Sequence, residues 1–408
     1  MRIAVVTHAF PPSTHSNAKR PFYIVRALLD AGWEVDVFTS NLACNKGVAE
    51  VLEYPKLAIN RVSDPVEDIR KKFARIGKLH RLVSMMFAGV LWPDQYSLWA
   101  KKVFRKVLSS DNYDRVLVFV FPPSAYLAGE KVAGNWTFDL QESVTPQFRK
   151  LQRRSPLQRM RLPKLERLER DALHAAGRVV FTANTNRQAY IAAGLVPETS
   201  TAHVPYFFDN AYFSTDAPVV GEKFEVHYFG TFDWRGSRSP KVFFRSLSAF
   251  LERNSNARQV TRFVFRGNWF PGHDELIDRY RLRDVVEVRS AVSYDDYLRL
   301  LRESPVLLLV VAPEHNLFMP SKIVDYFGAG RPILALVPDD SEMKSVLEEA
   351  GMGEYVAGHD DSDGCVKALE SLWIQHQGGH LTHPKGNVEK WSSDVRLPAY
   401  VEMLKELQ

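Results

Sequence analysis

The 408-residue sequence contains only two cysteines, Cys44 and Cys365, which lie far apart and belong to no CxxC pair. This scarcity excludes a disulfide-stapled scaffold and a cysteine-ligated zinc site, and it favours a reducing cytoplasm. Long hydrophobic runs are also missing, because no stretch approaches the roughly 20 consecutive apolar residues of a membrane span. The apolar run over residues 3–6 is too short for the core of a secretion signal. We therefore expect a cytoplasmic globular protein.

Neither sign of charge dominates the whole chain, whose net charge is only +5, but the two halves differ. Residues 1–210 contain 30 lysines and arginines against 19 acidic residues, whereas residues 211–408 contain 23 against 29. The first half is therefore strongly basic and the second half acidic. Such asymmetry suggests two domains with different partners, in keeping with a length that predicts two or three domains.

Short apolar runs alternate with amphipathic helical stretches along both halves, which predicts parallel sheets covered by helices on both faces. The predicted strands are Arg2–Thr7, Trp33–Thr39, Arg115–Phe121, Trp136–Leu140 and Arg178–Thr182, then Phe224–Phe229, Thr261–Arg266, Val285–Arg289, Val306–Val310 and Pro332–Leu336. We predict two α/β domains over residues 1–210 and 211–387, followed by a C-terminal helix over 388–408. Ligands of such folds bind at the carboxyl ends of the strands, so we expect the site in the cleft between the domains.

The most informative segment runs from Pro320 to Leu334, where a helix is predicted to begin near Ser321 after a strand and a loop. The N–H groups at a helix N-terminus favour an anion. Ser321 can cap this turn and Lys322 adds a positive charge. One turn later, Asp325 lies where a carboxylate can accept hydrogen bonds from a ribose. An ordinary strand–helix–strand unit with a glycine cap would explain the same residues.

This segment resembles the nucleotide-sugar-binding stretch of retaining glycosyltransferases of family 4, which reads roughly P-S/L-K-L-F-E-Y-M-A-A-G-K-P-V. Further matches follow in the order of that family, at Ala9–Pro12, Leu91–Asp94, Phe121–Ser124, Phe138–Glu142, Val204-Pro205 with Asp209 and Phe213, and Tyr228–Thr231. The resemblance implies the GT-B fold, in which two Rossmann-like doubly wound parallel-sheet domains face a cleft and the C-terminal helix returns to the N-terminal domain. It also implies transfer of a hexose-type sugar from a nucleoside diphosphate sugar, with retention of configuration.

In this family the second domain binds the donor, and fixed cations stabilise the charge that develops on the departing diphosphate. Arg235 matches the lysine of the family's basic loop, whereas Thr231 stands where the family has arginine, and we infer that Arg238 compensates. Leu317 occupies the position of a frequent glutamate, which leaves Glu314 as the nearby acid. The predicted donor-binding residues are Gly230, Thr231, Arg235, Arg238, Arg266, Gly267, Glu314, Ser321, Lys322 and Asp325.

Asp139 and Glu142 lie at the carboxyl end of a predicted strand and are the candidate catalytic residues. Carboxylates there can orient the acceptor hydroxyl, accept its proton or stabilise an oxocarbenium-like sugar. Glu142 can equally be an acid at a helix N-terminus. His8 is typical of a packed polar residue rather than a catalyst, and His15, in a predicted loop, is not a candidate either. The histidines of the C-terminal loop lack metal-ligand spacing, so we predict no metal and no cofactor apart from the donor substrate.

Two basic segments occur in the first half. Residues 69–81 contain six cations and no acid, among them Lys71, Lys72, Arg75 and Lys78, and residues 146–171 contain nine cations against three acids. Basic amphipathic helices favour an anionic membrane surface. A core-facing helix with a solvated charged face explains them equally well, and no nucleic-acid-binding pattern is present.

These features predict a polyprenyl-linked sugar or a growing polysaccharide as the acceptor, at the inner face of the cytoplasmic membrane, in cell-surface glycan synthesis. Two alternatives remain. A sugar-nucleotide epimerase of the same fold would need no acceptor. A non-catalytic partner subunit is favoured by Thr231 and Leu317, which both depart from the family at donor positions.

Overall fold

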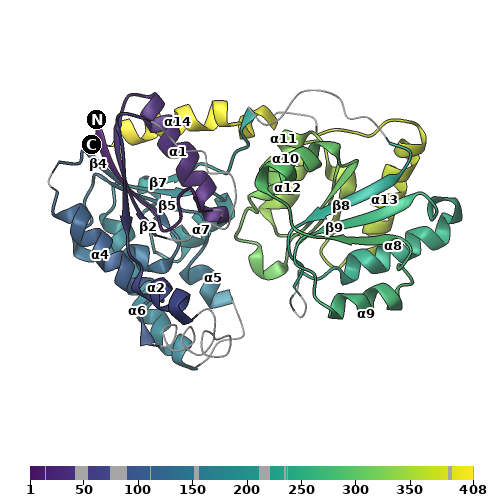
Figure 1. Cartoon of the computed structure of the whole chain (residues 1–408), viewed down its shortest axis with the longest axis horizontal. Helices are drawn as coiled ribbons and strands as arrows, with labels where there is room; N and C mark the ends of the chain where they lie inside the picture. Colours follow the sequence, from purple (N-terminus) through teal and green to yellow (C-terminus); the bar gives the residue numbers. More distant parts are fainter. Residues whose placement is uncertain are drawn as a thin grey trace. The chain divides into compact units, whose positions relative to one another are not determined.

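The computed structural model describes most of the chain, namely residues 1–13, 15–41, 54–73, 90–110, 112–150, 156–210, 221–233, 236, 238–384 and 388–407. The chain divides into two compact units. Unit 1 consists of Met1–Pro205 with Leu397–Gln408, and unit 2 consists of Tyr206–Arg396. Each unit contains one parallel sheet with helices on both faces (Figure 1). The predicted α/β class with two doubly wound parallel sheets is confirmed.

The described strands of unit 1 form a seven-stranded sheet in the order β3-β2-β1-β4-β5-β6-β7, and every pairing is parallel. Their bounds are β1 (Arg2–Val6), β2 (Glu34–Ser40), β3 (Leu57–Val62), β4 (Arg115–Val120), β5 (Trp136–Leu140), β6 (Arg178–Phe181) and β7 (Thr201–His203). The central strands are apolar and buried, as expected of a parallel sheet between two layers of helices. Because all of these strands run the same way, their carboxyl ends share one edge of the sheet.

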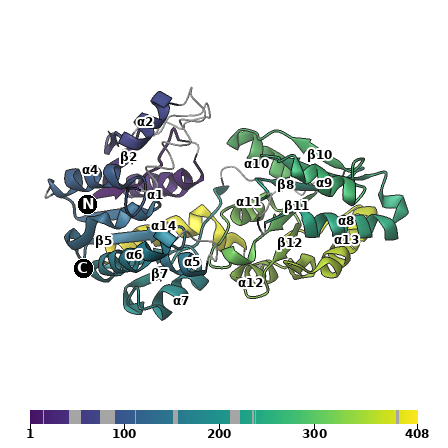
Figure 2. The same cartoon turned by 90° about the horizontal axis from the view of Figure 1, so that it is seen from below.

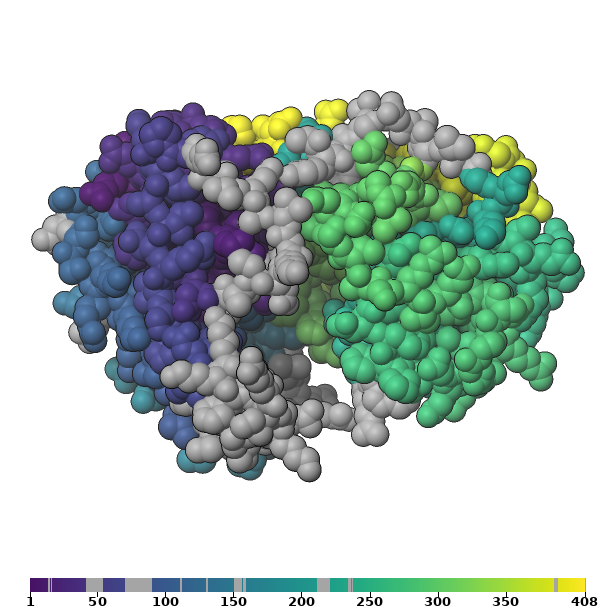
Figure 3. Space-filling view, viewed as in Figure 1, coloured from purple at the N-terminus to yellow at the C-terminus, as the bar shows by residue number. Residues whose placement is uncertain are grey.

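Helices cover both faces of this sheet. They are α1 (Lys19–Asp30), α2 (Pro65–Phe73), α4 (Ser97–Leu108), α5 (Thr145–Lys150), α6 (Pro156–Ala175), α7 (Asn184–Ala192) and the end of α14 (Ser393–Lys405). The predicted return of the C-terminal helix to the first domain is confirmed, because Leu397–Gln408 belongs to unit 1 and Arg115 donates a 2.9 Å hydrogen bond to the carbonyl oxygen of Leu404. In the space-filling view these yellow residues lie beside the purple N-terminal residues (Figure 3).

The described strands of unit 2 form a six-stranded parallel sheet in the order β10-β9-β8-β11-β12-β13. Their bounds are β8 (Phe224–Phe229), β9 (Thr261–Arg266), β10 (Val286–Arg289), β11 (Val306–Val310), β12 (Ile333–Val337) and β13 (Val356–Gly358). The helices are α8 (Lys241–Arg253), α9 (Gly272–Arg279), α10 (Tyr294–Glu303), α11 (Lys322–Ala329), α12 (Glu342–Glu349) and α13 (Ser362–Gln377). Helices α8 and α13 pack together on one face of the sheet, and α10 and α11 on the other (Figure 2).

The structure adds three strands that the sequence pattern does not predict, β3, β7 and β13. The segment after β4 forms a 3-10 helix, η2 (Pro123–Lys131), with a non-helical glycine at Gly129. Part of the first basic segment forms the end of α2, but residues 74–89, which include Arg75 and Lys78, lie outside the described residues. Among the described helices, none is both long and apolar enough to span a membrane.

Candidate functional site

Two glycines at the carboxyl edge of the unit 2 sheet bring the backbones of neighbouring strands into contact. Gly230 follows β8 and donates a 2.9 Å hydrogen bond from its N–H to the carbonyl oxygen of Arg266 at the end of β9. Gly267 has a positive φ of +150°, and a Cβ atom there would lie 1.9 Å from the carbonyl oxygen of Gly230. No side chain fits between these two positions. The edge therefore exposes backbone that a ligand can approach closely.

The ammonium group of Lys322 lies beside this glycine pair. It donates a 2.8 Å hydrogen bond to the carbonyl oxygen of Phe229 and lies 4.5 Å from the centre of the Tyr228 ring. Burial, and secondarily the positive charge of Arg238, lowers the pKa of Lys322 to about 7. No carboxylate of the described residues forms an ion pair with it. A poorly solvated cation without a counter-charge is the complement of an anionic ligand.

Two further cations belong to the same edge. Burial, and then the charges of Arg289 and Arg299, lowers the pKa of Arg266, whose buried Nε has no partner among the described groups. Arg238 lies 3.4 Å from the carboxylate of Asp233, while its own Nε is buried without a partner. Of these two predicted donor-binding cations, Arg238 is therefore paired with a carboxylate and Arg266 is not.

Helix α11 and its N-cap contain two further predicted donor-binding residues, Ser321 and Asp325. Ser321 lies at its N-cap position with helical backbone angles and makes no capping hydrogen bond, so the predicted cap does not form. Its hydroxyl is bound by no other described residue. Asp325 is 5% exposed and accepts a 3.3 Å hydrogen bond from the Tyr297 hydroxyl. Gly330 ends the helix in a left-handed conformation, with φ +64°.

The remaining predicted donor residues lie in two loops. Thr231 directly follows Gly230, and its carbonyl oxygen accepts a 3.4 Å hydrogen bond from Tyr228. Arg235 lies outside the described residues. Glu314 precedes His315, whose pKa is lowered by burial although the charge of Glu314 opposes the shift. Leu317 is buried and contributes to the core rather than to a polar site.

Asp139 lies in the core of unit 1. Its carboxylate is fully buried in unit 1 and is bound by the guanidinium group of Arg20, with distances of 2.9–3.1 Å. The Tyr400 hydroxyl donates a further hydrogen bond of 2.8 Å. Such partners are typical of a structural ion pair, and the catalytic role of Asp139 stays a prediction.

Glu142 has a different environment from Asp139. It follows β5 at the carboxyl edge of the unit 1 sheet, and burial raises the pKa of its carboxyl group. It makes no hydrogen bond to a described residue, and α5 begins three residues later, so the catalytic role and the alternative as an acid at a helix N-terminus both stay predictions. A raised pKa suits a group that exchanges protons near neutral pH.

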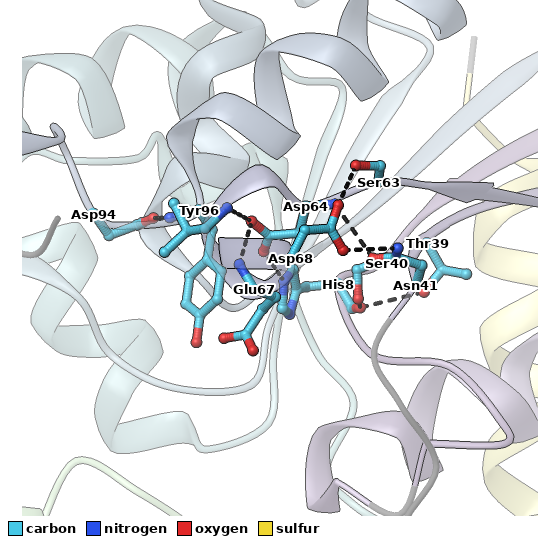
Figure 4. Close-up of polar contacts among 11 residues, drawn as sticks. His8, Thr39, Ser40, Asn41, Ser63, Asp64, Glu67, Asp68, Asp94 and Tyr96 are labelled. Atoms are coloured by element: carbon cyan, nitrogen blue, oxygen red, sulfur yellow. Dashed lines mark hydrogen bonds and ion pairs between the residues drawn. The ribbon is translucent and has the colours of Figure 1, made fainter. Parts of the chain in front are cut away.

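A second polar cluster lies at the same edge and was not predicted as functional (Figure 4). The Nε2 atom of His8, two residues beyond β1, lies 3.3 Å from Oδ2 of Asp64, which follows β3. His8 is 5% exposed and Asp64 is fully buried. The other carboxylate oxygen of Asp64 accepts the N–H groups of Val66 and Glu67 at the start of α2. The cluster therefore contains a histidine oriented by a fixed carboxylate.

Asp94 belongs to the same region, because the charge of His8 acts on its carboxyl group and lowers its pKa, although burial has the larger and opposite effect. Its two oxygens accept the N–H groups of Tyr96, at 2.7 Å, and Ser124, at 2.6 Å. Burial raises the pKa of Asp94, although both N–H donors oppose the shift. The one sequence signal for the cluster is the polar residue directly after the first buried strand, since strand-end side chains line the site edge of α/β folds. Among the described residues, no group of three or more histidine, cysteine or acidic side chains could hold a metal ion.

Comparisons with known proteins identify the architecture. No protein-family model matches the chain, and no curated protein sequence does. Sucrose-phosphate synthase from Thermosynechococcus elongatus is a similar solved structure, with a TM-score of 0.66 and 16% identity over 100% of this chain and 98% of that one.

Two other solved structures share the fold. WaaG, a glycosyltransferase involved in lipopolysaccharide biosynthesis, gives a TM-score of 0.63 at 13% identity over 99% of this chain and 100% of its own. A UDP-forming trehalose-phosphate synthase from Burkholderia xenovorans gives 0.64 at 11% identity over 100% and 99%. These neighbours are glycosyltransferases of the GT-B fold. At such low identity the likeness establishes the fold alone, and the chain has the GT-B fold.

Proposed function

We propose that this protein is a glycosyltransferase that moves a hexose-type sugar from a nucleoside diphosphate sugar to an acceptor hydroxyl group, and that unit 2 binds the donor. The observation that carries the proposal is the ammonium group of Lys322. It is poorly solvated, has a pKa of about 7 and forms no ion pair with a described residue. A diphosphate would supply the missing counter-charge at the carboxyl edge of the sheet, where open α/β folds bind their ligands.

The surrounding groups suit a diphosphate in particular. The Gly230–Gly267 contact lets a phosphate approach the backbone, Arg266 offers an unpaired guanidinium edge, and the Ser321 hydroxyl is free to donate. As the bond between the sugar and the phosphate breaks, negative charge grows on the leaving group, and fixed cations stabilise that charge. Because these cations come from the chain, we propose that the transfer needs no metal held by protein side chains.

The finer assignments rest on the resemblance and on the structural neighbours. One neighbour, trehalose-6-phosphate synthase, is described as transferring a glycosyl group with retention, and another is bound with UDP-2-fluoro glucose. We propose retention here too. The basic surplus of the first half, which suits anionic substrates, supports a phosphate-bearing acceptor in unit 1, either a polyprenyl-linked sugar or a polysaccharide attached to one. Synthesis of a cell-surface glycan at the inner face of the cytoplasmic membrane is the setting we propose.

Isothermal titration calorimetry of the full chain with UDP and GDP, and then with UDP-glucose and GDP-mannose, tests the proposal. We expect one of the two nucleotides to bind at micromolar concentration and its sugar derivative to be consumed only slowly without an acceptor. Conversion of the sugar to an isomer would instead indicate an epimerase. Failure of every nucleotide to bind would overturn the proposal.

A further inference from the structure

Arg331 is a buried cation of unit 2 whose charge is not compensated. It follows Gly330, which ends α11, and it is 8% exposed. It makes no hydrogen bond and no ion pair with a described residue, and its Nε atom is completely enclosed without a partner. Burial, and then the positive charge of Arg302, lowers the pKa of its guanidinium group to about 10. Because a buried charge without a partner costs free energy, an anion from outside the chain would stabilise this side chain.

This cation lies at the edge of the sheet opposite the candidate donor site. Arg331 comes two residues before β12, and α10, which ends at Glu303, leads into β11. The two strands are parallel neighbours, with Leu307 paired to Ile333. The carboxyl ends of α10 and α11 therefore lie at the amino edge of the sheet. Lys322 begins α11 at the other edge, and the eight residues of this helix separate the two cations by about 12 Å.

Arg302 supplies a second cation at the same edge. It is an exposed residue in the last turn of α10, and it forms no ion pair with a described residue. Its charge contributes to the lowered pKa of Arg331, so the two guanidinium groups lie near each other and repel. An anion bound between them would remove this repulsion and pair both charges.

The helix end beside Arg331 does not compensate its charge. An arginine near the carboxyl end of a helix can donate hydrogen bonds to the last carbonyl groups, but Arg331 donates to none. The carbonyl oxygen of the preceding residue, Gly330, is instead bound by Nδ1 of His383 at 2.7 Å. Of the three nitrogens of Arg331, Nε alone is enclosed without a partner, so the two Nη groups are the part that reaches solvent. These groups are therefore accessible to a ligand at the surface.

We propose that Arg331 and Arg302 bind a doubly charged phosphate group at the amino edge of the unit 2 sheet, at a site separate from the one proposed for the donor. A phosphate group carries close to two negative charges near pH 7, which matches two arginines, and a guanidinium group can bind two of its oxygens at once. A single carboxylate would leave one arginine unpaired. The site requires no residue of unit 1 and does not depend on the proposed function.

Thermal unfolding of the full chain in phosphate-free buffer, with titration of sodium phosphate or glycerol 3-phosphate, tests the site. Sodium chloride of equal ionic strength is the salt control. We expect one of the two ligands to raise the Tm of the wild type above that control, because a ligand that binds only the folded state stabilises it. The ligand that binds more tightly shows whether the site takes free phosphate or a phosphate ester. A wild type that neither ligand stabilises beyond the salt control would overturn the proposal.

Substitutions of the two arginines test their part in the site. In Arg331→Met and in Arg302→Met the apparent dissociation constant should rise at least about tenfold, as expected for loss of a hydrogen bond to a charged group. Arg279→Met removes the exposed arginine in the last turn of α9, so it is the matched control for Arg302→Met and should respond like the wild type. Equal affinities of these two surface variants would contradict the site, even if Arg331→Met does not fold.

The ligand-free proteins distinguish binding from a structural role of Arg331. Without phosphate, Arg331→Met should unfold at the temperature of the wild type or above it, because methionine preserves much of the packing and removes an unpaired buried charge. A much lower Tm of Arg331→Met, with a normal phosphate response in Arg302→Met, would assign Arg331 to the stability of the fold and overturn the proposal.

Lys322→Met separates this inference from the proposed function. Stabilisation by phosphate should persist in Lys322→Met and be lost in Arg331→Met, whereas nucleotide binding should show the reverse pattern. Stabilisation that is lost in Lys322→Met and retained in Arg331→Met would place the phosphate at the donor edge and refute the second site. Absence of nucleotide binding in the wild type would refute the proposed function and leave the phosphate titrations decisive for this site.

Discussion

The guanidinium group of Arg20 and the carboxylate of Asp139 form a completely buried ion pair, with Nε and Nη2 of the arginine 3.0 and 2.9 Å from the two carboxylate oxygens. Arg20 also donates 2.9 Å hydrogen bonds to the carbonyl oxygens of Val204 and Pro205. The pair thus connects α1 to β5. It also connects α1 to Val204 and Pro205, where the first of the two segments of unit 1 ends. These contacts are typical of a structural ion pair.

Removing one partner should therefore destabilise the fold. Arg20→Met leaves the Asp139 carboxylate buried without its cation, and breaking such a pair costs roughly 3–5 kcal/mol. Urea unfolding should show this loss for Arg20→Met, and Arg20→Met/Asp139→Leu should recover part of it. The control is Arg299→Ala, whose exposed ion pairs on α10 should contribute less than about 1 kcal/mol.

A substitution of Asp139 distinguishes a structural from a catalytic role of its carboxylate. In Asp139→Asn, under conditions where the variant is folded, we expect kcat within about threefold of the wild type, whereas loss of a general base costs roughly 100-fold or more. A 100-fold drop in kcat with unchanged circular dichroism would support the catalytic assignment.

Lys322 should dominate nucleotide binding. A hydrogen bond to a charged group contributes roughly 1.5–3 kcal/mol, which corresponds to about 10- to 100-fold in affinity. Calorimetry should show that loss for UDP or GDP in Lys322→Met, a variant that keeps most of the packing. Lys344→Met on α12, whose exposed ammonium pairs with Asp339, is the matched control and should bind normally. Equal affinities of the two variants would contradict the proposed donor site.

The pH dependence of binding follows from the pKa of Lys322, which is about 7 in the free protein. Bound diphosphate favours the charged amine, so the affinity should fall as the pH rises above 7, by at most about tenfold per unit. Binding to Lys322→Met should change less over the same range. Calorimetry at pH 6.5, 7.5 and 8.5 measures the difference.

The stability of the free protein should change with pH in the opposite direction to the nucleotide affinity. The folded-state pKa of Lys322 lies below its ordinary value of 10.5, so the unfolded chain binds more protons between pH 7 and 10.5. The free energy of unfolding of the wild type should therefore rise with pH over that window relative to Lys322→Met. Parallel curves for the two proteins would show that Lys322 is well solvated.

Gly267 should tolerate no side chain. An alanine Cβ would lie 1.9 Å from the carbonyl oxygen of Gly230, and the backbone has a φ of +150°. The strands would have to separate, so Gly267→Ala should lose roughly 3 kcal/mol of stability and bind nucleotide weakly. Gly221→Ala is the control, because nothing lies within 4 Å of its added methyl group. Thermal unfolding with and without UDP compares the two.

The proposed membrane contact is tested by charge reversal. Replacing Lys71, Lys72, Arg75 and Lys78 with glutamate should release the protein from vesicles that contain a quarter phosphatidylserine. The matched control reverses four exposed cations of α4 and changes the net charge equally: Lys101, Lys102, Arg105 and Lys106. A wild type that fails to bind such vesicles at low salt would refute the membrane proposal.

The buried strands were predictable because a parallel sheet leaves a continuous apolar signal. Phe224–Phe229 and Val306–Val310 have the predicted bounds. The strands that were missed are edge strands: β3 exposes Ala58, Ile59 and Arg61 and so lacks a continuous buried run, and β7 and β13 have only three residues each. Their pairing depends on a neighbouring strand rather than on their own composition.

The residues of the candidate site show the same difference between local and long-range signals. Lys322 was predictable because a single local segment, a loop followed by the start of a helix, determines its position. The partner of His8 was not, since Asp64 lies 56 residues away and follows the unpredicted strand β3. Asp139 shows the converse, because its strand-end position suggests catalysis while its actual partners come from α1 and α14. The local sequence pattern predicts where a side chain lies along the edge of a sheet. Its contacts come from segments that are distant in the sequence, and these contacts determine its role.

The position of Tyr400 has a consequence for the order of folding. This residue completes the Arg20–Asp139 pair from α14, yet the ribosome delivers it only after all of unit 2 has been synthesised. Until then the Asp139 carboxylate has Arg20 as its partner but lacks the hydrogen bond from the Tyr400 hydroxyl. The unit that is translated first is therefore the one that matures last.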